Sequence, residues 1–350
     1  MSNRGKLTVL VGGQYGSEGK GAVAAFVANR YDMHVRVGSH NAGHTIYWNG
    51  DKHVMQSVPC GWINPNALIV IGRGANINIE TLLKEIEHIE KYYPDFKERL
   101  IIDGKAGVLD ERFVKEEGGT SGEMHKRIGS TGEGVGPARM ARIARDPEKF
   151  YLFETIADKY NLGRCVAYNT PALIASYQDM RRNVLIEGTQ GSALSLLHSY
   201  WPYCTSIDTN AAGIISEVGI APSRVTDVLM VCRTYPIRVA GNSGPMNKEI
   251  SWEILSERIG KPVTEKTTVT KKTRRVAEWD DTLFAQSCIL NEPTEIALMF
   301  ADYVDPDIYG KTSVEDIEKS EKLNKFMEDH NLVGKVTLIG TGPETMVEVR

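Results

Sequence analysis

A glycine-rich loop between an apolar run and a helix-like segment constrains this chain most. Leu7–Val11 predicts a strand, and glycines follow at positions 12, 13, 16, 19 and 21, before the helix-like run Ala22–Asn29. Closely spaced glycines let backbone N–H groups surround an anion, and a helix start adds a favourable dipole. Lys20 places a positive charge among them. The segment therefore predicts a strand–loop–helix unit that binds the phosphates of a nucleotide.

The loop departs from the Walker A motif, in which Gly-x4-Gly-Lys precedes Ser or Thr. Gln14 stands at the first glycine position, and Gly21 replaces the hydroxyl residue that would bind magnesium. This departure indicates a different phosphate-binding family. The loop alone leaves open a plain strand–turn–helix in which the glycines serve only close packing.

The composition excludes several classes of protein. A length of 350 residues with 41% hydrophobic content allows a large core, and we expect one elaborated domain over residues 1–350. The net charge of −4 argues against a nucleic-acid or membrane partner. Five scattered cysteines form no CxxC pair, which disfavours a disulfide framework or a zinc site. The lack of a signal peptide or a spanning apolar run favours the cytoplasm.

Short apolar runs alternate with helical patterns along the chain. The expected strands are Leu7–Val11, His34–Val37, Leu68–Ile71, Leu100–Asp103, Val184–Ile186, Val228–Cys232, Ile296–Phe300 and Lys335–Ile339. The expected helices include Gly21–Arg30, Asn78–Tyr92, Thr170–Arg182, Ser251–Ile259 and Val314–Asp329. This alternation predicts an α/β fold with a central, mostly parallel sheet and flanking helices. Long functional loops are expected at Glu117–Gly136, Val239–Pro245 and Glu265–Glu278.

A second motif, Ser39–Thr45, contains two histidines four residues apart. On a helix this spacing could bind a metal, but Gly43 and the β-prone residues after it argue against a helix. A positioned proton donor is a better interpretation, because histidine titrates near neutral pH. A hydrogen-bonded loop histidine without a chemical role is the alternative.

Three further segments carry groups that suit anionic or polar ligands. Ile128–Ala138, followed by Arg142 and Arg145, combines hydroxyls, glycine amides and guanidinium groups that suit a monophosphate. Ile186–Gly191 runs from a strand into a loop and places Gln190 at the ligand-binding edge of the sheet. The basic run Thr267–Arg275 suits a carboxylate substrate. Solvated loops are the alternative for these segments.

In this order the motifs closely resemble those of the adenylosuccinate synthetase family. The family shows GDEGKG, NAGH, TGxGxGPA, EGxQG, a TVTGRRRR-like loop and a C-terminal TGP. The corresponding segments here are GSEGKG at 16–21, NAGH at 41–44, STGEGVGPA at 130–138, EGTQG at 187–191, TVTKKTRR at 268–275 and TGP at 341–343. Because these ordered motifs span the chain, the resemblance is specific.

The resemblance implies a ligase built on a central, mostly parallel sheet. Family enzymes join L-aspartate to a purine nucleotide in two steps. A nucleoside triphosphate first phosphorylates the C6 oxygen, and the aspartate amine then displaces that phosphate. The resemblance also implies Mg²⁺ as cofactor, with Ser17 and Gly43 at the ligand positions. It implies a homodimer in which Arg145 reaches the monophosphate across the interface.

The motif match further implies roles for individual residues. His44 would be the general acid, with Ser17 and Gln190 as the other catalytic positions. The triphosphate site would comprise Gly16, Ser17, Glu18, Gly19, Lys20, Gly21, Gly43, His44, Thr45, Arg274, Asp302, Thr341, Gly342 and Pro343. The purine monophosphate site would comprise Ser17, Asn41, Ser130, Thr131, Arg145, Gln190, Thr205 and Lys272. The aspartate site would comprise Thr268, Val269, Thr270, Lys272 and Arg274.

Ser17 departs from the family pattern. The family has an aspartate here, which removes the purine N1 proton and helps to bind magnesium. A hydroxyl is neither a useful base near pH 7 nor a strong magnesium ligand. Three interpretations follow: a non-catalytic, regulatory nucleotide-binding paralogue, an ordinary enzyme that uses IMP and GTP with another base, or an enzyme for a different purine.

We favour a different purine. Aspartate at N1 also crowds C2, whereas serine leaves room for a 2-amino group and can accept its hydrogen bond. Guanine keeps the N1–H and C6=O groups on which the chemistry depends. This resembles the bacteriophage branch of the family, the 2-aminoadenylosuccinate synthases of diaminopurine synthesis, which join L-aspartate to dGMP and carry serine here. For a viral chain the expected location is the host cytoplasm.

Two smaller departures concern the phosphoryl donor and the aspartate loop. Met299–Asp302 stands where the family's TKxD segment recognises the guanine of GTP, and Phe300 replaces the lysine. ATP or dATP is therefore the expected donor, although Phe300 could simply end a buried strand. In the basic loop Lys272 replaces an arginine, which keeps the charge but loses bidentate geometry.

Overall fold

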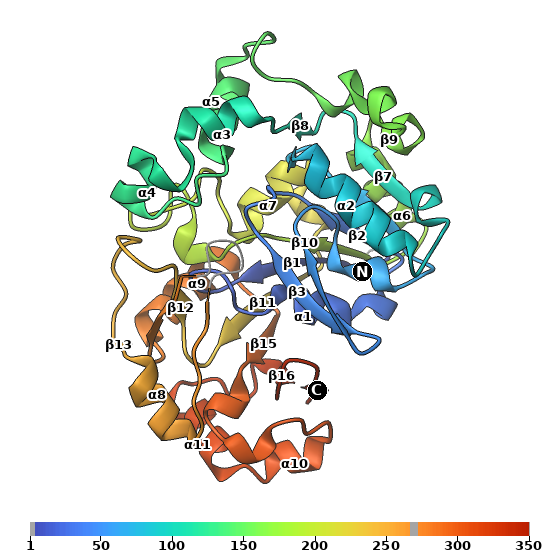
Figure 1. The fold of residues 1–350 in the computed structure, drawn as a ribbon. Coiled ribbons are helices and arrows are strands. Elements are labelled where there is room, and N and C mark those ends of the chain that lie inside the picture. The colour runs from blue at the N-terminus through green and yellow to red at the C-terminus, as the bar shows by residue number, and fades with distance from the viewer. Residues whose placement is uncertain (1–3, 267–271, 350) are drawn as a thin grey trace.

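A large sheet forms the centre of the molecule (Figure 1). It has ten strands in the order β17-β16-β15-β11-β1-β10-β2-β5-β7-β9. The computed structural model describes residues 4–266 and 272–349. All neighbouring strands of the sheet run parallel except β16 and β17. The strands are β17 (Met346–Glu348), β16 (Val336–Gly340), β15 (Glu295–Met299), β11 (Asp227–Arg233), β1 (Leu7–Gly12), β10 (Val184–Glu187), β2 (Met33–Arg36), β5 (Leu68–Ile71), β7 (Leu100–Asp103) and β9 (Val166–Ala167). Every strand expected from the sequence lies in this sheet, which confirms the α/β prediction.

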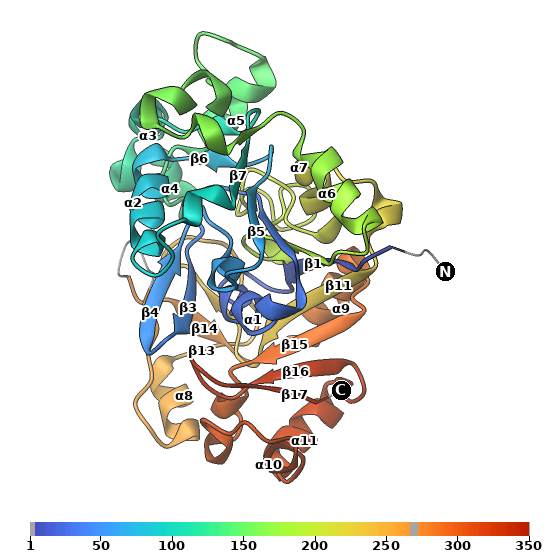
Figure 2. The ribbon, with the colours of Figure 1, turned by 90° about the vertical axis from the view of Figure 1, so that its right-hand side faces the viewer.

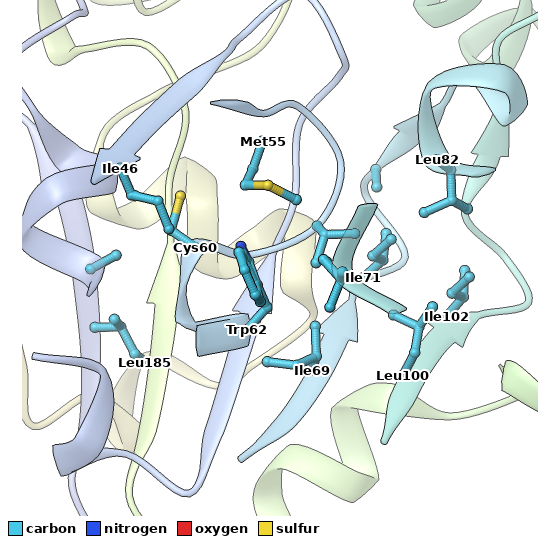
Figure 3. Close-up of a cluster of buried hydrophobic side chains, with 14 of the residues drawn as sticks. Ile46, Met55, Cys60, Trp62, Ile69, Ile71, Leu82, Leu100, Ile102 and Leu185 are labelled. Carbon is cyan, nitrogen blue, oxygen red and sulfur yellow. The ribbon is translucent and has the colours of Figure 1, made fainter. Parts of the chain in front are cut away.

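The strands are apolar almost throughout because both faces of the sheet are covered. On β1, Val9 and Val11 belong to one buried cluster, and Leu10 belongs to the cluster on the opposite face. Figure 3 shows part of the second cluster, in which Trp62 lies near Ile69 of β5. Burying each of the aliphatic side chains in these clusters contributes about 1.5–3 kcal/mol to the free energy of folding. The two clusters together fix the position of β1 in the middle of the sheet.

Helices flank the sheet, and several follow the sequence prediction closely. They are α1 (Lys20–Phe26), α2 (Ile79–Glu90), α3 (Glu111–Glu117), α4 (Glu123–Ile128), α5 (Val135–Ala144), α6 (Thr170–Asp179), α7 (Ala211–Val218), α8 (Trp252–Ile259), α9 (Asp281–Asn291), α10 (Val314–Glu318) and α11 (Glu321–Asp329). The helix expected from residue 21 to 30 ends at Phe26, and a short 3-10 turn follows over Ala28–Arg30.

Two predictions at the level of elements need correction. The single helix expected over 314–329 is two helices, because Ser320 caps α11 by accepting a hydrogen bond from the amide of Leu323 at 3.2 Å. The loop expected over 117–136 contains α4 and the first residues of α5. None of the residues of α4, all of which are described, is buried, and its 6 residues are too few for a helical period to stand out in the sequence.

Shorter strands form three additional small sheets. The hairpin of β3 (His44–Trp48) and β4 (Asp51–Met55) lies beside α1 (Figure 2). A small antiparallel sheet contains β12 (Ile237–Arg238), β14 (Arg275–Ala277) and β13 (Glu249–Ile250). The last pair is β6 (Asn76–Ile77) with β8 (Gly107–Val108). The hairpin matters for function because its first residue is His44.

The sequence motifs meet at the carboxyl edge of the central sheet. The glycine loop follows β1, the Ser39–His44 segment follows β2, and Gln190 follows β10. Asp302 and Thr341 follow β15 and β16. Because β1 lies between β10 and β11, the chain order changes direction there, and such a switch point is where α/β sheets bind ligands. Within the described part of the chain, no helix is long and apolar enough to cross a membrane.

Gly61 is expected to be essential for packing beneath the hairpin. A Cβ atom at this position would lie 2.1 Å from the ring of His34, which is fully buried. Gly61→Ala should therefore lower the free energy of unfolding by about 1–3 kcal/mol. Gly136→Ala is the matched control, because a Cβ there meets nothing within 4 Å. Urea unfolding of both variants tests this, and equal stabilities would contradict it.

Candidate active site

The glycine loop between β1 and α1 has a left-handed backbone at three positions. Gly16 has φ 85° and Gly19 has φ 106°, values that glycine adopts without steric cost. Ser17 between them has φ 58°, and it is exposed to solvent. The loop therefore presents position 17 outward, where a ligand can contact it.

Glu18 supports this loop from beneath. One carboxylate oxygen accepts hydrogen bonds from the amides of Gln14 at 3.1 Å and Gly16 at 2.8 Å. The other oxygen lies 2.6 Å from Nζ of Lys20, and both side chains are buried. The loop is thus held in shape by the chain itself, with the Lys20 charge at its base. The roles expected for Glu18, Lys20 and Gly21 toward a triphosphate remain predictions.

A buried ion-pair network lies next to the loop. Oε1 of Glu187, at the end of β10, lies 3.0 Å from Nη1 of Arg36 and 2.5 Å from Nδ1 of His44. Oε2 accepts a hydrogen bond from the amide of Cys60 at 2.7 Å. A Cβ on Gly21 would lie 2.9 Å from Cβ of His44, so the start of α1 and His44 are in close contact. The network holds His44 beside the glycine loop.

Electrostatics keep His44 neutral and Glu187 ionised. Burial, together with Arg36, lowers the pKa of His44 to about 4 in spite of Glu187. Burial alone would raise the pKa of Glu187, but Arg36 and His44 lower it to about 2. Because the hydrogen bond to Glu187 uses Nδ1 of His44 as donor, Nε2 is the nitrogen left for a ligand. The anionic phosphates of a ligand would favour protonation of that nitrogen.

Sequence reasoning did not assign roles to Arg36 and Glu187. Glu187 stood inside the EGTQG motif, and its position at a strand end was the available signal. Ligand-type atoms of His44, Cys60 and Glu187 lie within 4.8 Å of one another. The guanidinium of Arg36 already contacts the same oxygen of Glu187, so this cluster is a salt-bridge network and not a cation site.

Asn41 and Gln190 have buried side-chain oxygens that accept no hydrogen bond from the described residues. These atoms are Oδ1 of Asn41 and Oε1 of Gln190. A Cβ on Gly16 would lie 3.6 Å from Cα of Gln190, so the backbone of Gln190 lies beside the glycine loop. Burying an amide oxygen without a partner costs about 1–3 kcal/mol. Such atoms at a ligand-binding edge are consistent with the predicted purine nucleotide site.

The segment expected to bind a monophosphate is held by a carboxylate. Glu117, at the end of α3, accepts hydrogen bonds from the Ser130 hydroxyl and, at 2.5 Å, from the amide of Gly134. The carbonyl of Ser130 lies 2.5 Å from Nδ1 of His125, whose Nε2 lies 3.0 Å from Nζ of Lys272. The structure thus brings the predicted residues Ser130 and Lys272 into one connected group.

Of the other predicted monophosphate ligands, Thr131 directly follows Ser130, whereas Thr205 and Arg145 belong to other segments. Thr131 is half-buried in the same turn. Thr205 is half-buried, and its amide donates to the carbonyl of Leu194 at 2.8 Å. Arg145 is exposed at the carboxyl end of α5 with φ 58°. Its position on the surface suits a contact outside its own subunit, which remains a prediction.

The predicted aspartate loop is described only in part. Thr268, Val269 and Thr270 lie outside the described residues. The amide of Arg274 donates to the carbonyl of Glu265 at 2.8 Å, and burial lowers the pKa of the Arg274 guanidinium. Arg233 forms a two-pronged ion pair with Glu265, at the base of the loop.

The edge beyond β15 carries the residues expected to recognise the donor base. The Arg233 guanidinium lies 3.8 Å from the centre of the Phe300 ring. Asp302 is buried, which raises its pKa to about 6, and its carboxylate lies 3.9 Å from Nζ of Lys261. Thr341 follows β16, and its hydroxyl donates to the carbonyl of Lys311 at 2.7 Å. Gly342 and Pro343 continue the same turn.

The residues expected to bind magnesium offer few ligands of their own. Ser17 presents a hydroxyl and Gly43 a backbone carbonyl, while the nearby carboxylate of Glu18 is bound to Lys20. Mg²⁺ keeps several waters and is often bound through substrate phosphates plus one or two carboxylates. The donor set therefore fits an ion held mainly by the oxygens of a bound nucleotide.

The fold and the site together define an α/β protein with a glycine-rich loop and a buried ion-pair network at the carboxyl edge of its central sheet. The family model for adenylosuccinate synthetase matches residues 9–162 and 148–308. The chain therefore belongs to the adenylosuccinate synthetase family, whose members are carbon–nitrogen ligases of purine biosynthesis and use Mg²⁺.

Curated relatives and solved structures agree with this assignment. The chain is 41% identical over 343 residues to adenylosuccinate synthetase of Methanococcus maripaludis strain C7, with 96% of each chain covered. It is 37% identical over 347 residues to that of Methanocaldococcus jannaschii, covering 96% of this chain and 94% of the relative. Succinoaminodeoxyadenylate synthetase of cyanophage S-2L, solved with dGMP and with dATP as energy donor, has a TM-score of 0.80 and 28% identity over 97% of this chain and 93% of its own. Fully ligated adenylosuccinate synthetase from Plasmodium falciparum has a TM-score of 0.83 at 22% identity, covering 99% of this chain and all of its own (100%), and supports the fold.

The buried histidines His34 and His44 should make the fold sensitive to acid. Burial lowers the pKa of each to about 4, whereas an unfolded histidine titrates at about 6.5. Between these values the unfolded chain binds more protons than the folded chain. The free energy of unfolding should therefore fall as the pH drops from about 6.5 to 4, by on the order of 3 kcal/mol per histidine.

Urea unfolding at about pH 7 and about pH 4.5 measures this loss. His34→Gln removes one of the two groups and should show a smaller difference between the two pH values. An equal difference in the variant and the unmodified chain would contradict the assignment to buried histidines.

Proposed function

We propose that this protein joins L-aspartate to C6 of dGMP, with ATP or dATP as the energy donor, and so supplies diaminopurine nucleotide synthesis. The observation that carries the proposal is Ser17. It is exposed in the glycine loop at the position where the family has its catalytic aspartate. A short neutral side chain there leaves room for the 2-amino group of guanine and can accept its hydrogen bond.

The backbone at position 17 sharpens this argument. A left-handed φ of 58° is adopted more readily by aspartate and asparagine than by serine. The loop conformation therefore gives no reason to exchange aspartate for serine. We attribute the exchange to what the side chain contacts, which supports a change of purine. The cyanophage enzyme, solved with dGMP and dATP, adds support from a chain with 28% identity.

The proposed reaction has two steps that the site can serve. In the first, N1 of the purine loses its proton to water, the C6 oxygen attacks the γ-phosphorus of the donor, the bond to the β-phosphate oxygen breaks, and the nucleoside diphosphate leaves. In the second, the aspartate amine attacks C6, inorganic phosphate leaves with the former C6 oxygen, and the amine nitrogen releases a proton to water. His44 and Lys20 would stabilise charge on the transferring group, and Gln190 would hold the purine edge. Arg274 would bind an aspartate carboxylate.

The donor preference rests on Phe300. An apolar ring stands where the family has the lysine of its guanine-recognition segment, and Arg233 covers one of its faces. Asp302 remains buried beside it. We therefore assign ATP or dATP and not GTP as the donor.

The proposal extends to assembly and location. Exposed Met140 and Ile143 on α5 lie close in sequence to Arg145, which fits an interface between two copies of the chain. Arg145 would then reach the partner's monophosphate site. We propose a homodimeric, single-domain enzyme of the cytoplasm, or of the host cytoplasm if the chain is viral, with Mg²⁺ bound mainly through the nucleotide oxygens.

The archaeal relatives support a second candidate, an ordinary adenylosuccinate synthetase that uses IMP and GTP. Those relatives carry that name at up to 41% identity, which exceeds the identity to the cyanophage enzyme. With either purine a group other than Ser17 would take the N1 proton, because guanine and hypoxanthine both carry N1–H. A regulatory paralogue without activity is the candidate from another class.

The substrate is tested by aspartate-dependent release of ADP from ATP with dGMP, GMP and IMP in parallel, and by the mass of the product. We expect an aspartate adduct of dGMP and little product from IMP. Turnover of IMP alone would support the second candidate. No turnover with any of the three, under ATP or GTP, would support the regulatory paralogue.

Ser17→Asp should weaken the use of dGMP. The added carboxylate would crowd C2, and we expect kcat/KM for dGMP to fall by at least about tenfold, with any gain appearing on IMP. Ser17→Ala is the matched control, because it keeps the space and removes only the hydroxyl. Unchanged turnover of dGMP by Ser17→Asp would show that position 17 does not face C2.

A further inference from the structure

The imidazole of His40 joins two segments that are far apart in the sequence. Its Nε2 lies 2.9 Å from Oε2 of Glu133, which follows the turn that contains Ser130 and Thr131. The His40 side chain is 6% exposed and that of Glu133 27%, so the contact is largely shielded from water. None of the roles assigned above includes either residue.

The backbone of His40 is anchored from the opposite side. The Gln56 side-chain amide donates to the carbonyl of His40. Gln56 is fixed in turn by Glu85 of α2, a buried carboxylate that accepts hydrogen bonds from the amides of Gln56, Ser57 and Val58. Three amides on one carboxylate make this a rigid support, so His40 has little freedom to move away from the sheet.

The same loop is fixed at its other end, next to the proposed acid. Nη2 of Arg36 donates to the carbonyl of Ala42 at 2.6 Å, and His44 is bound to Glu187. Between these anchors lies Asn41, whose buried Oδ1 has no partner in the described part of the chain. The anchors named so far come from β2, β10, α2 and the segment after β4, whereas Glu133 contacts the loop from the proposed monophosphate segment.

Glu133 cannot move independently of that segment. It lies between Gly132 and Gly134, which have φ 74° and 78°. A Cβ on Gly132 would lie 2.3 Å from the backbone of Gly119, so the turn packs tightly against the start of the loop. Glu117 ties Gly134 and Ser130 together. A displacement of Ser130 on ligand binding would therefore be transmitted to Glu133.

We propose that His40 and Glu133 are a positioning pair that couples the monophosphate segment to the loop carrying His44. The inference rests on the proposed function in taking residues 130–134 as the binding segment for the purine nucleotide. Neither residue touches the reacting atoms. Their contact sets the position of Asn41 and His44 when the nucleotide is bound, so it acts on phosphoryl transfer more than on binding.

The experiment separates binding from transfer. Glu133→Ala should lower the single-turnover rate of phosphoryl transfer about tenfold at saturating nucleotide, a coupling typical of residues in direct contact. It should weaken nucleotide binding, measured by calorimetry without the triphosphate, by no more than about threefold. Glu133→Gln, which keeps an acceptor oxygen, should recover part of the rate. His40→Asn combined with Glu133→Ala should be no slower than the slower single variant.

Glu123→Ala is the matched control for lost charge. Glu123 is exposed on α4 in the same part of the chain and pairs with Lys126 at 3.1 Å. It should leave both readouts as in the unmodified chain. The positioning pair would be overturned by a normal transfer rate in Glu133→Ala. It would also be overturned if the rate losses of the two single variants multiplied in the double variant. His40 is buried, so His40→Asn can disturb folding. If that variant does not fold, the Glu133→Ala and Glu133→Gln results decide the test on their own.

The measurements are made with both dGMP and IMP. If the unmodified chain uses IMP and not dGMP, the proposed purine is wrong, and the positioning pair is tested on IMP with the same expected values. If it turns over neither nucleotide, there is no transfer step to position, and both proposals are overturned.

Discussion

The carboxylate of Glu187 is the fixed point on which the arrangement of the site depends. It is completely buried, and it satisfies Arg36 of β2, His44 of β3 and the amide of Cys60 at once. A buried charge that loses one of its partners costs about 3–5 kcal/mol, so these segments are held together strongly. Two parallel strands, a hairpin and the turn after it therefore meet at one group, and the proposed acid takes its position from that group.

A second ionic contact plays the corresponding part on the donor side. Arg233, at the end of β11, is fully buried, and it binds Glu265 and packs on Phe300. It also donates to the carbonyl of Ser17 at 3.3 Å. One guanidinium thus touches the glycine loop, the base of the basic loop and the aromatic ring at the proposed donor site. The three segments take their relative positions from this side chain.

Local patterns predicted most of the fold and less of the site. Strands such as Leu7–Gly12 were predictable, because a sheet covered on both faces needs continuous apolar runs. The prediction of one continuous helix over 314–329 was wrong. The N-cap of α11, Ser320, interrupts the helix without disturbing the apolar period on which the prediction was based. The partners of His44 could not be predicted, since Arg36 and Glu187 are 151 positions apart and only the parallel register of β2 and β10 brings them together. The roles of Ser17 and Arg145 are matters of ligand and subunit contacts, which the fold alone does not determine.

The place of β1 between β10 and β11 has a consequence for how such an enzyme can diverge. Segments after β2 and β10 would hold the nucleotide that is modified, and segments after β15 and β16 would hold the energy donor. The two groups lie on opposite sides of β1, so under the proposed function each can change its specificity without rebuilding the other. Ser17 lies on the loop that follows β1, between the two groups of segments. A substitution at this position can therefore affect both nucleotides. A lineage could thus change the purine that it modifies and the triphosphate that it consumes in separate evolutionary steps, while both sites continue to share the glycine loop.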